Sequence, residues 1–248
     1  MKIPSFHWWR TAFYLTPAVA ILTIAAGTIS VVSSLFDRTG RFAHAVARWW
    51  GRGILVVTGV TIHVRGMDQL VPAATYVFVA NHQSFYDIPA LFWSLPYQLR
   101  IIAKESLGSV PFLGWHLQRT GHILVDRRNP DRKAILGRWR ELVDAGLSLI
   151  IFPEGTRSRD GRVAPFKSGS FMLALQAGLP VVPITIVGTR AVMPRGRFTV
   201  RPGAVTLTLH APIVTQGRAE APGIHNARTL AAEVREIVSA GVDERTCA

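Results

Sequence analysis

Downstream of residue 53 the chain alternates between short apolar runs and longer stretches with helical periodicity. Runs rich in β-branched and aromatic residues predict strands at 54–64, 75–80, 99–103, 122–125, 148–152, 181–187, and 199–200 with 205–209. Apolar positions at helical spacing predict helices at 84–94, 111–118, 131–145, 168–177 and 227–240. This alternation is typical of an α/β fold, in which helices flank a central, mostly parallel or mixed β-sheet.

The first 52 residues follow another pattern. No charged residue lies between Arg10 and Asp37, a stretch longer than the roughly 20 residues that a membrane span requires. A single span and a re-entrant or in-plane helical hairpin both fit it. The sequence therefore predicts an N-terminal membrane-associated helical segment at 1–52 and an α/β domain at 53–248.

An amphipathic segment follows the apolar stretch. Basic side chains recur at helical spacing opposite apolar ones: Arg41, His44, Arg48 and Arg52 against Phe42, Ala45, Val46, Trp49 and Trp50. Such a helix suits a position among anionic headgroups. The flank after the apolar stretch also carries more Arg and Lys than the flank before it, which predicts a location at the cell inner membrane with the α/β domain on the cytoplasmic side.

Composition narrows the partners. A formal net charge of +13 favours a polyanionic partner, which could be nucleic acid, anionic lipid or a phosphorylated substrate. The long apolar stretch and seven Trp residues favour anionic membrane lipids over nucleic acid. The single cysteine, Cys247, excludes an internal disulfide framework, argues against a cysteine-based zinc site, and lies too near the C-terminus to serve as a nucleophile.

Polar residues 81–87 directly follow the predicted strand at 75–80, where an α/β sheet usually places its chemistry. They include His82 and Asp87, a base and a carboxylate that could orient it. Five residues along a helix turn through roughly 500°, so the two side chains can meet only if His82 precedes the helix and Asp87 lies in its first turn. Ser84 and Asp87 form a capping-box pattern that permits this. Alternatively, Asp87 only caps the helix and His82 is an ordinary loop residue.

Two further constellations follow predicted strands. Arg127 follows the strand at 122–125 and could grip a phosphate, or it could belong to a solvated basic loop. The stretch 152–158 contains Glu154, Gly155 and Arg157, and basic residues continue to Lys167, just before the helix at 168–177. Basic side chains beside a helix N-terminus form an anion site, so phosphate binding is favoured over a solvated surface.

The predicted strand at 181–187 has a further peculiarity. Proline occurs at position 183 within it and at position 180 just before it. Proline lacks the backbone N–H that a sheet needs, so this pattern is typical of an edge strand or a bulge.

These motifs occur in the order and spacing found in the glycerolipid acyltransferase family. Over roughly 54–209 the chain resembles 1-acyl-sn-glycerol-3-phosphate acyltransferases, also called lysophosphatidic acid acyltransferases. The resemblance rests on the HX4D motif from His82 to Asp87, on 121–127, on 152–158 and on 182–184. Lys104 and the stretch 166–169 match the family less specifically.

The resemblance implies an activity. His82 would be the general base for the sn-2 hydroxyl of lysophosphatidic acid, and Asp87 would orient its imidazole. The glycerol phosphate would be bound by Arg127, Glu154, Gly155, Thr156 and Arg157, with Lys104 and Lys167 beside them. The donor would be an acyl-CoA or acyl-carrier-protein thioester, the product phosphatidic acid, and neither a bound cofactor nor a metal would be required.

Other interpretations stay open at this point. The acceptor could be glycerol 3-phosphate, a lyso-ornithine lipid or another lyso-phospholipid. The protein could instead hydrolyse thioesters or phospholipids. A non-catalytic basic module that binds anionic membranes would explain the charge and the apolar segment, but not the HX4D motif or the loop around Glu154.

Overall fold

The computed structural model describes residues 5–37, 39–126, 128–129, 131–217 and 223–246, and within them the chain forms one mixed sheet. Its seven strands lie in the order β1-β7-β6-β2-β5-β3-β4. Only the β6–β7 pair is antiparallel among these strand pairs. In chain order the strands are β1 (Val60–Arg65), β2 (Val77–Ala80), β3 (Leu99–Lys104), β4 (Ile123–Val125), β5 (Ser148–Ile151), β6 (Val181–Val187) and β7 (Gly203–Leu209).

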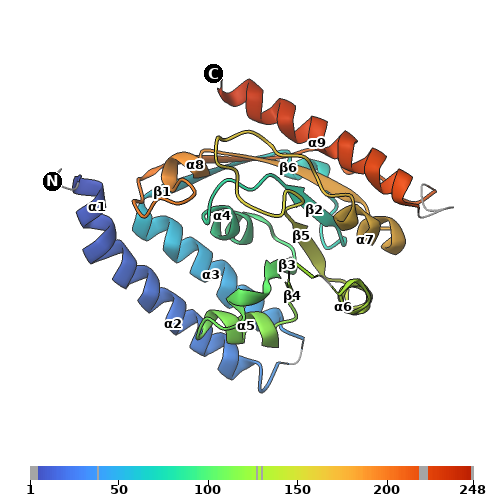
Figure 1. The fold of residues 1–248 in the computed structure, drawn as a ribbon. Helices are drawn as coiled ribbons and strands as arrows, with labels where there is room; N and C mark the ends of the chain where they lie inside the picture. The colour runs from blue at the N-terminus through green and yellow to red at the C-terminus, as the bar shows by residue number, and fades with distance from the viewer. Residues whose placement is uncertain (1–4, 38, 127, 130, 218–222, 247–248) are drawn as a thin grey trace.

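Helices cover both faces of this sheet (Figure 1). They are α1 (Phe6–Arg10), a π-helical turn (Thr11–Leu15), α2 (Thr16–Ser33), α3 (Arg41–Thr58), α4 (Asp87–Ser94), α5 (Leu113–Arg119), α6 (Arg132–Asp144), α7 (Gly169–Ala177), α8 (Thr189–Val192) and α9 (Ile224–Thr246). Short 3₁₀ turns occur at Met67–Gln69 and Glu105–Leu107. The predicted α/β class with a mixed, helix-flanked sheet is confirmed.

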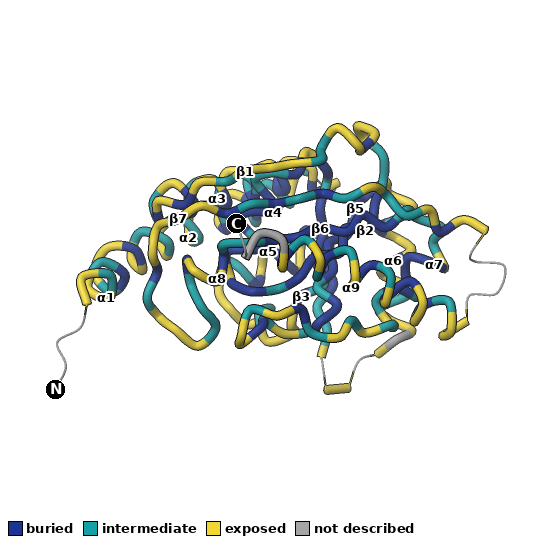
Figure 2. The backbone as a smooth tube through the Cα atoms, turned by 90° about the horizontal axis from the view of Figure 1, so that it is seen from above, coloured by how far each residue is buried: buried dark blue, intermediate teal, exposed yellow. Residues whose placement is uncertain are grey.

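The central strand β2 separates two cores. Phe78 and Ala80 belong to the core shared with α2, α3 and α4, whereas Val77 and Val79 belong to the core shared with α6, α7 and α9. Side chains alternate between the faces of a strand, so a strand covered on both faces is apolar throughout. The most deeply buried backbone accordingly runs through β2, β5 and β6 (Figure 2).

The N-terminal helices form a hairpin against the domain (Figure 1). The helical segment Phe6–Ser33 is long and apolar enough to cross a membrane, and few of its residues are buried, which fits association with a membrane. It packs on α3, where the Trp50 indole donates to Thr23 Oγ1 (3.1 Å). Helix α3 in turn lies so close to α4 that a Cβ at Gly51 would approach Pro89 O to 2.9 Å.

Helix α3 differs from the sequence-based picture at three points. The predicted strand at 54–64 is wrong in its first half, because residues 54–58 are helical and β1 begins at Val60. The apolar side chains of Ile54 and Leu55 pack into the core from this helix. The helix ends at Gly59, which has the left-handed conformation (φ 76°). The expected domain boundary between residues 52 and 53 thus falls inside α3. His44 is buried rather than part of an exposed basic stripe.

The end of the sheet differs from expectation as well. Residues 199–200 are not a strand, and β7 begins at Gly203. Strand β6 is an interior strand between β2 and β7, not an edge. Pro183 is tolerated there because the β6–β7 ladder starts only at Ile184; the Pro183 carbonyl accepts from the backbone N–H of His210, just beyond the end of β7.

Candidate active site

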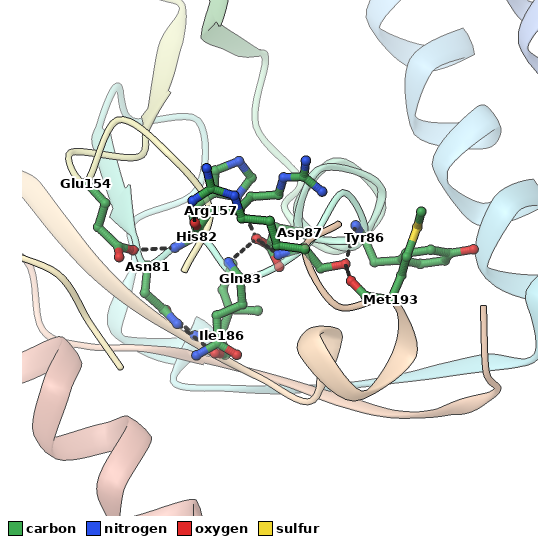
Figure 3. A network of polar contacts seen from close by, with 11 residues as sticks. Asn81, His82, Gln83, Tyr86, Asp87, Glu154, Arg157, Ile186 and Met193 are labelled. Carbon is green, nitrogen blue, oxygen red and sulfur yellow. Dashed lines mark hydrogen bonds and ion pairs between the residues drawn. The ribbon is translucent and has the colours of Figure 1, made fainter. Parts of the chain in front are cut away.

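His82 and Asp87 meet at the carboxyl end of β2. His82 lies in the loop after the strand, and Asp87 is the first residue of α4. The His82 Nδ1 to Asp87 Oδ2 distance is 2.7 Å, and the Asp87 side chain is fully buried while the His82 side chain is 14% exposed. The predicted encounter is therefore confirmed, and the imidazole keeps access to a ligand (Figure 3).

The loop backbone holds the carboxylate in place. Asp87 Oδ2 accepts from the backbone N–H groups of Gln83 (2.8 Å) and Ser84 (2.9 Å) as well as from His82. Asp87 thus fills the acidic half of the expected capping box. Ser84 Oγ fills the other half weakly, because it accepts from the backbone N–H of Tyr86 (3.3 Å) in the turn before α4, and its hydroxyl also donates to the carbonyl of Met193 (2.8 Å). Because a carboxylate only accepts, the proton of a neutral His82 lies on Nδ1, which leaves Nε2 free to act as a base.

Aromatic stacking fixes the other side of the imidazole. The His82 ring stacks on Phe152, with centroids 4.2 Å apart and planes at 25°. Phe152 follows β5, which pairs directly with β2. The base is thus clamped between a carboxylate from its own loop and a ring from the neighbouring strand.

Glu154 connects the loop after β5, on which it lies, to the loop after β2 that carries His82. One of its carboxylate oxygens accepts from the backbone N–H of His82 (2.6 Å), and the other accepts from that of Ala164 (3.0 Å). Burial raises the pKa of Glu154, while the two backbone N–H groups oppose that rise. Because both oxygens are engaged by backbone, this geometry supports a positioning role for Glu154 more than direct contact with a substrate.

Arg157 provides positive charge beside the base (Figure 3). Its guanidinium lies 3.7 Å over the exposed ring of Phe85. Arg195 donates to the carbonyl of Arg157 (2.6 Å), and burial together with the charge of Arg195 lowers the pKa of Arg157. In the described parts of the chain, neither arginine has a carboxylate within ion-pair distance, so the pair can take an external anion.

The other residues expected to bind the substrate phosphate show fewer contacts with His82 and Arg157. Lys167 covers Gly155: a Cβ there would lie 2.8 Å from the ammonium nitrogen, and the φ of 71° also favours glycine. Thr156 is exposed on the same loop, and Lys104 is exposed at the end of β3. Arg127 lies outside the described residues.

Sequence reasoning missed Arg195 and the role of Phe85. Arg195 follows α8, more than thirty residues after the loop it supports. Its only sequence signal is a run of basic residues after the last central strand, which equally fits a solvated loop. Phe85 is inside the HX4D motif, but its exposure could not be read from the motif.

A large apolar cavity opens beside the site. It has a volume of about 730 Å³ and lies between the N-terminal helices, α4 and α5. Phe85, Tyr86 and Met193 line the end nearest His82. Within the described residues, no group of three or more His, Cys, Asp or Glu side chains could hold a metal ion.

Comparisons with known proteins agree with this architecture. The acyltransferase family model matches residues 61–187. A chloroplastic 1-acyl-sn-glycerol-3-phosphate acyltransferase of Brassica napus is 40% identical over 72% of this chain and 53% of its own length. A 1-acyl-sn-glycerol-3-phosphate acyltransferase of Saccharomyces cerevisiae is 30% identical over 84% of this chain and 71% of its own.

A solved structure extends the similarity to the whole fold. The crystal structure of the 1-acyl-sn-glycerophosphate acyltransferase PlsC from Thermotoga maritima superposes with a TM-score of 0.82 at 28% identity, covering 98% of this chain and 99% of that one. The chain spans about half the length of the plant and algal relatives it matches. On these grounds the chain belongs to the acyltransferase family that includes 1-acyl-sn-glycerol-3-phosphate acyltransferases.

Proposed function

We propose that the protein transfers a fatty acyl group from an acyl thioester to the sn-2 hydroxyl of lysophosphatidic acid, which gives phosphatidic acid for phospholipid biosynthesis. The observation that carries this proposal is the placement of the His82–Asp87 pair beside an apolar cavity and beside Arg157, which has no ion-pair partner in the part of the chain that the structure describes. A base, an anion site and a lipid site then adjoin one another. The names of the relatives support the same acceptor.

The reaction needs no protein nucleophile. Nε2 of His82 takes the proton of the acceptor hydroxyl as its oxygen attacks the thioester carbonyl. When the tetrahedral intermediate collapses, the C–S bond breaks and the imidazolium returns the proton to the leaving thiolate. Asp87 holds the productive tautomer and stabilises the imidazolium, as the carboxylate does in a catalytic triad. General-base catalysis contributes about 10²–10⁴-fold, and positioning of the two substrates contributes up to about 7–11 kcal/mol.

The acceptor phosphate would lie against Arg157 and Arg195. A guanidinium that is stacked on Phe85 and partly withdrawn from water has a fixed orientation, which favours bidentate contact with phosphate. Lys167, Gly155, Thr156, Lys104 and Arg127 would complete the surrounding charge and the close backbone approach. Glu154 would act indirectly, by joining the His82 loop to the loop that carries Arg157.

The acyl chains would reach the site from a lipid bilayer. The cavity beside His82 is bounded by the exposed, apolar segment Phe6–Ser33, so a chain could enter it without crossing water. The excess of basic residues after this segment supports attachment to the inner membrane with the site on the cytoplasmic side, through contacts with anionic lipids.

The test is acceptor-dependent thioester cleavage by the full chain in lipid vesicles. Release of thiol from hexadecanoyl-CoA, and from the corresponding acyl-carrier-protein thioester, should depend on lysophosphatidic acid and yield phosphatidic acid. Glycerol 3-phosphate and a lysophospholipid with a larger headgroup serve as competing acceptors. Thiol release with free fatty acid as product and no need for an acceptor would refute the proposal in favour of a hydrolase, and vesicle binding without thiol release would favour a membrane-binding module.

A further inference from the structure

The apolar cavity has a second end, remote from His82. Phe85 lines the end near His82, and Phe92 lies deeper, five residues along α4 from its first residue, Asp87; at about 1.5 Å per helical residue this is about 7–8 Å along the helix axis. His122 also lines the cavity, and its ring lies 6.1 Å from that of Phe92. His116 lies beside His122, with ring centroids 5.4 Å apart. The cavity therefore runs from one histidine site to another.

The threonines on the cavity wall are already satisfied by the protein. The hydroxyls of Thr11, Thr16 and Thr23 donate to carbonyls one turn earlier in their own helix. Thr11 also accepts from the backbone N–H of Val200, and Thr23 from the Trp50 indole. These side chains have little capacity left for a ligand.

The two inner histidines differ from these threonines. His122 Nδ1 accepts from the backbone N–H of Ile101 (3.0 Å), so its neutral ring carries the proton on Nε2. His116 Nδ1 lies 2.5 Å from Ser30 Oγ, a hydroxyl that can donate or accept. Among the described residues neither Nε2 has a hydrogen-bond partner. One fixed donor and one adaptable nitrogen thus remain at the inner end.

Burial keeps both rings neutral. It lowers the pKa of His116 to about 4 and that of His122 well below its ordinary value, and the positive charge of buried Arg100 lowers both further. A proton on His44 would likewise oppose protonation of His122. A neutral donor and a neutral acceptor match an uncharged oxygen group, because a hydroxyl both accepts and donates.

We propose that His116 and His122 form a subsite for a hydroxyl or carbonyl group on an acyl chain, at a position far from the thioester. This inference rests on the proposed function, in which the cavity holds an acyl chain. A wholly apolar cavity would discriminate against such a chain, because its oxygen would be buried without a partner. With both rings present the oxygen has hydrogen-bond partners, so an oxygenated chain is no longer excluded.

The test compares hexadecanoyl chains with and without one hydroxyl, placed at carbon 3, 10 or 16. One arm carries the hydroxyl on the thioester donor and the other on the chain of lysophosphatidic acid, which shows whose chain occupies the cavity. The readout is the kcat/KM of the hydroxylated substrate divided by that of the plain one. In the unmodified protein we expect this ratio to lie within about threefold of unity for one hydroxyl position, on either the donor chain or the acceptor chain. At that position the hydrogen bond to the histidines offsets the cost of burying the hydroxyl.

His116→Leu should lower that ratio by about tenfold or more, because a site built for a hydroxyl loses its partner. His116→Gln, which keeps a polar atom, should restore part of the ratio. Leu113→Val is the matched control, since it alters the same cavity without a polar change. A ratio taken within one variant does not depend on how much of that variant is folded.

The outcomes separate the two proposals. If the plain chain is not transferred, the proposed function and this inference both fail. If the plain chain is transferred but the ratio is the same in His116→Leu as in the unmodified protein, only the inference fails. It also fails if the unmodified protein prefers the plain chain by more than about 100-fold at every hydroxyl position in both arms, which is the discrimination expected of an apolar pocket.

Discussion

The two ends of the cavity use the same side chain in opposite surroundings. His82 contacts a buried carboxylate, and Arg157, which has no ion-pair partner among the described residues, lies beside it on the neighbouring loop (Figure 3). At the inner end, His116 and His122 lie beside the buried cation Arg100. The carboxylate stabilises an imidazolium at the first end, whereas burial and positive charge prevent one at the second.

This difference decides what each histidine can do. A base must accept a proton during the reaction, so it needs a neighbour that stabilises the charged form. A ligand for a neutral oxygen must avoid that charge. The role of a histidine therefore follows from its nearest charged group and its burial more than from the residue type itself.

The largest effect should come from removing the charge that distinguishes the catalytic end. Asp87→Asn keeps the side chain's size but can no longer hold the proton on Nδ1, so we expect kcat to fall by about 10³–10⁴-fold. The measurement is acceptor-dependent thiol release. Asp68→Asn, an exposed control, should retain full activity; a loss of less than tenfold in Asp87→Asn would contradict the role of this carboxylate.

Removal of the cation beside His82 should have the next largest effect. Arg157→Ala should raise the KM for lysophosphatidic acid by about 10–100-fold, corresponding to about 1.4–2.7 kcal/mol of lost phosphate contact. Arg195→Ala should raise the same KM less, because Arg157 stays in place. The variant removes only the second guanidinium and its hydrogen bond to the Arg157 carbonyl. Arg159→Ala is the matched control on the same loop. An unchanged KM for lysophosphatidic acid in Arg157→Ala would show that Arg157 does not bind the phosphate.

Glu154→Gln tests whether the loops are held together through backbone contacts. The amide retains one acceptor but turns an N–H₂ group toward the other backbone N–H, so we expect about a tenfold loss of kcat with little change in acceptor KM. Because burial raises the folded-state pKa of Glu154, its contribution to stability is fully present below the unfolded pKa and is lost as the pH rises through the folded pKa.

The stability advantage of the unmodified protein over Glu154→Gln should therefore be largest in acid and shrink as the pH rises. Denaturant unfolding at several pH values measures this difference. A stability advantage that grows with pH would show that folding stabilises the ionised form of Glu154, contrary to its raised pKa. A large rise in acceptor KM would instead indicate that Glu154 contacts the substrate.

The smallest effect concerns the buried histidines. Burial lowers the pKa of His44 to about 3 from 6.5, so between these values the unfolded chain binds a proton that the folded protein does not. The free energy of unfolding should therefore fall as the pH drops below about 6.5, by up to about 1.4 kcal/mol per pH unit for this residue. His44→Leu should reduce that slope by this amount.

Denaturant unfolding between pH 7 and pH 5 measures the slope, and His63→Gln, at an exposed position, should leave it unchanged. Parallel slopes for His44→Leu and the unmodified protein would show that His44 is protonated in the folded state. In that case the inner end would carry positive charge, and it would not differ from the site around His82 in this respect.

Local patterns in the sequence determined the α/β class, most of the strands and the contact between His82 and Asp87. A strand end, a capping carboxylate and a helix start lie within seven residues, and backbone geometry alone limits how His82 and Asp87 can meet. The unbroken apolar run of β2 likewise indicates a strand that is buried on both faces. Such features depend on neighbours along the chain, so they can be read without a fold.

The tertiary structure decided the features that depend on distant segments. Residues 54–58 are helical because α3 packs on α2 and α4, which overrides their β-branched character. His44 belongs to an amphipathic pattern but faces the core, and Arg195 reaches Arg157 from across the domain. The cavity exists only where α2, α4 and α5 converge. Burial and charge at a point in space are sums over the whole fold, and for this reason only the folded chain distinguishes His82 from the histidines at the other end of the cavity.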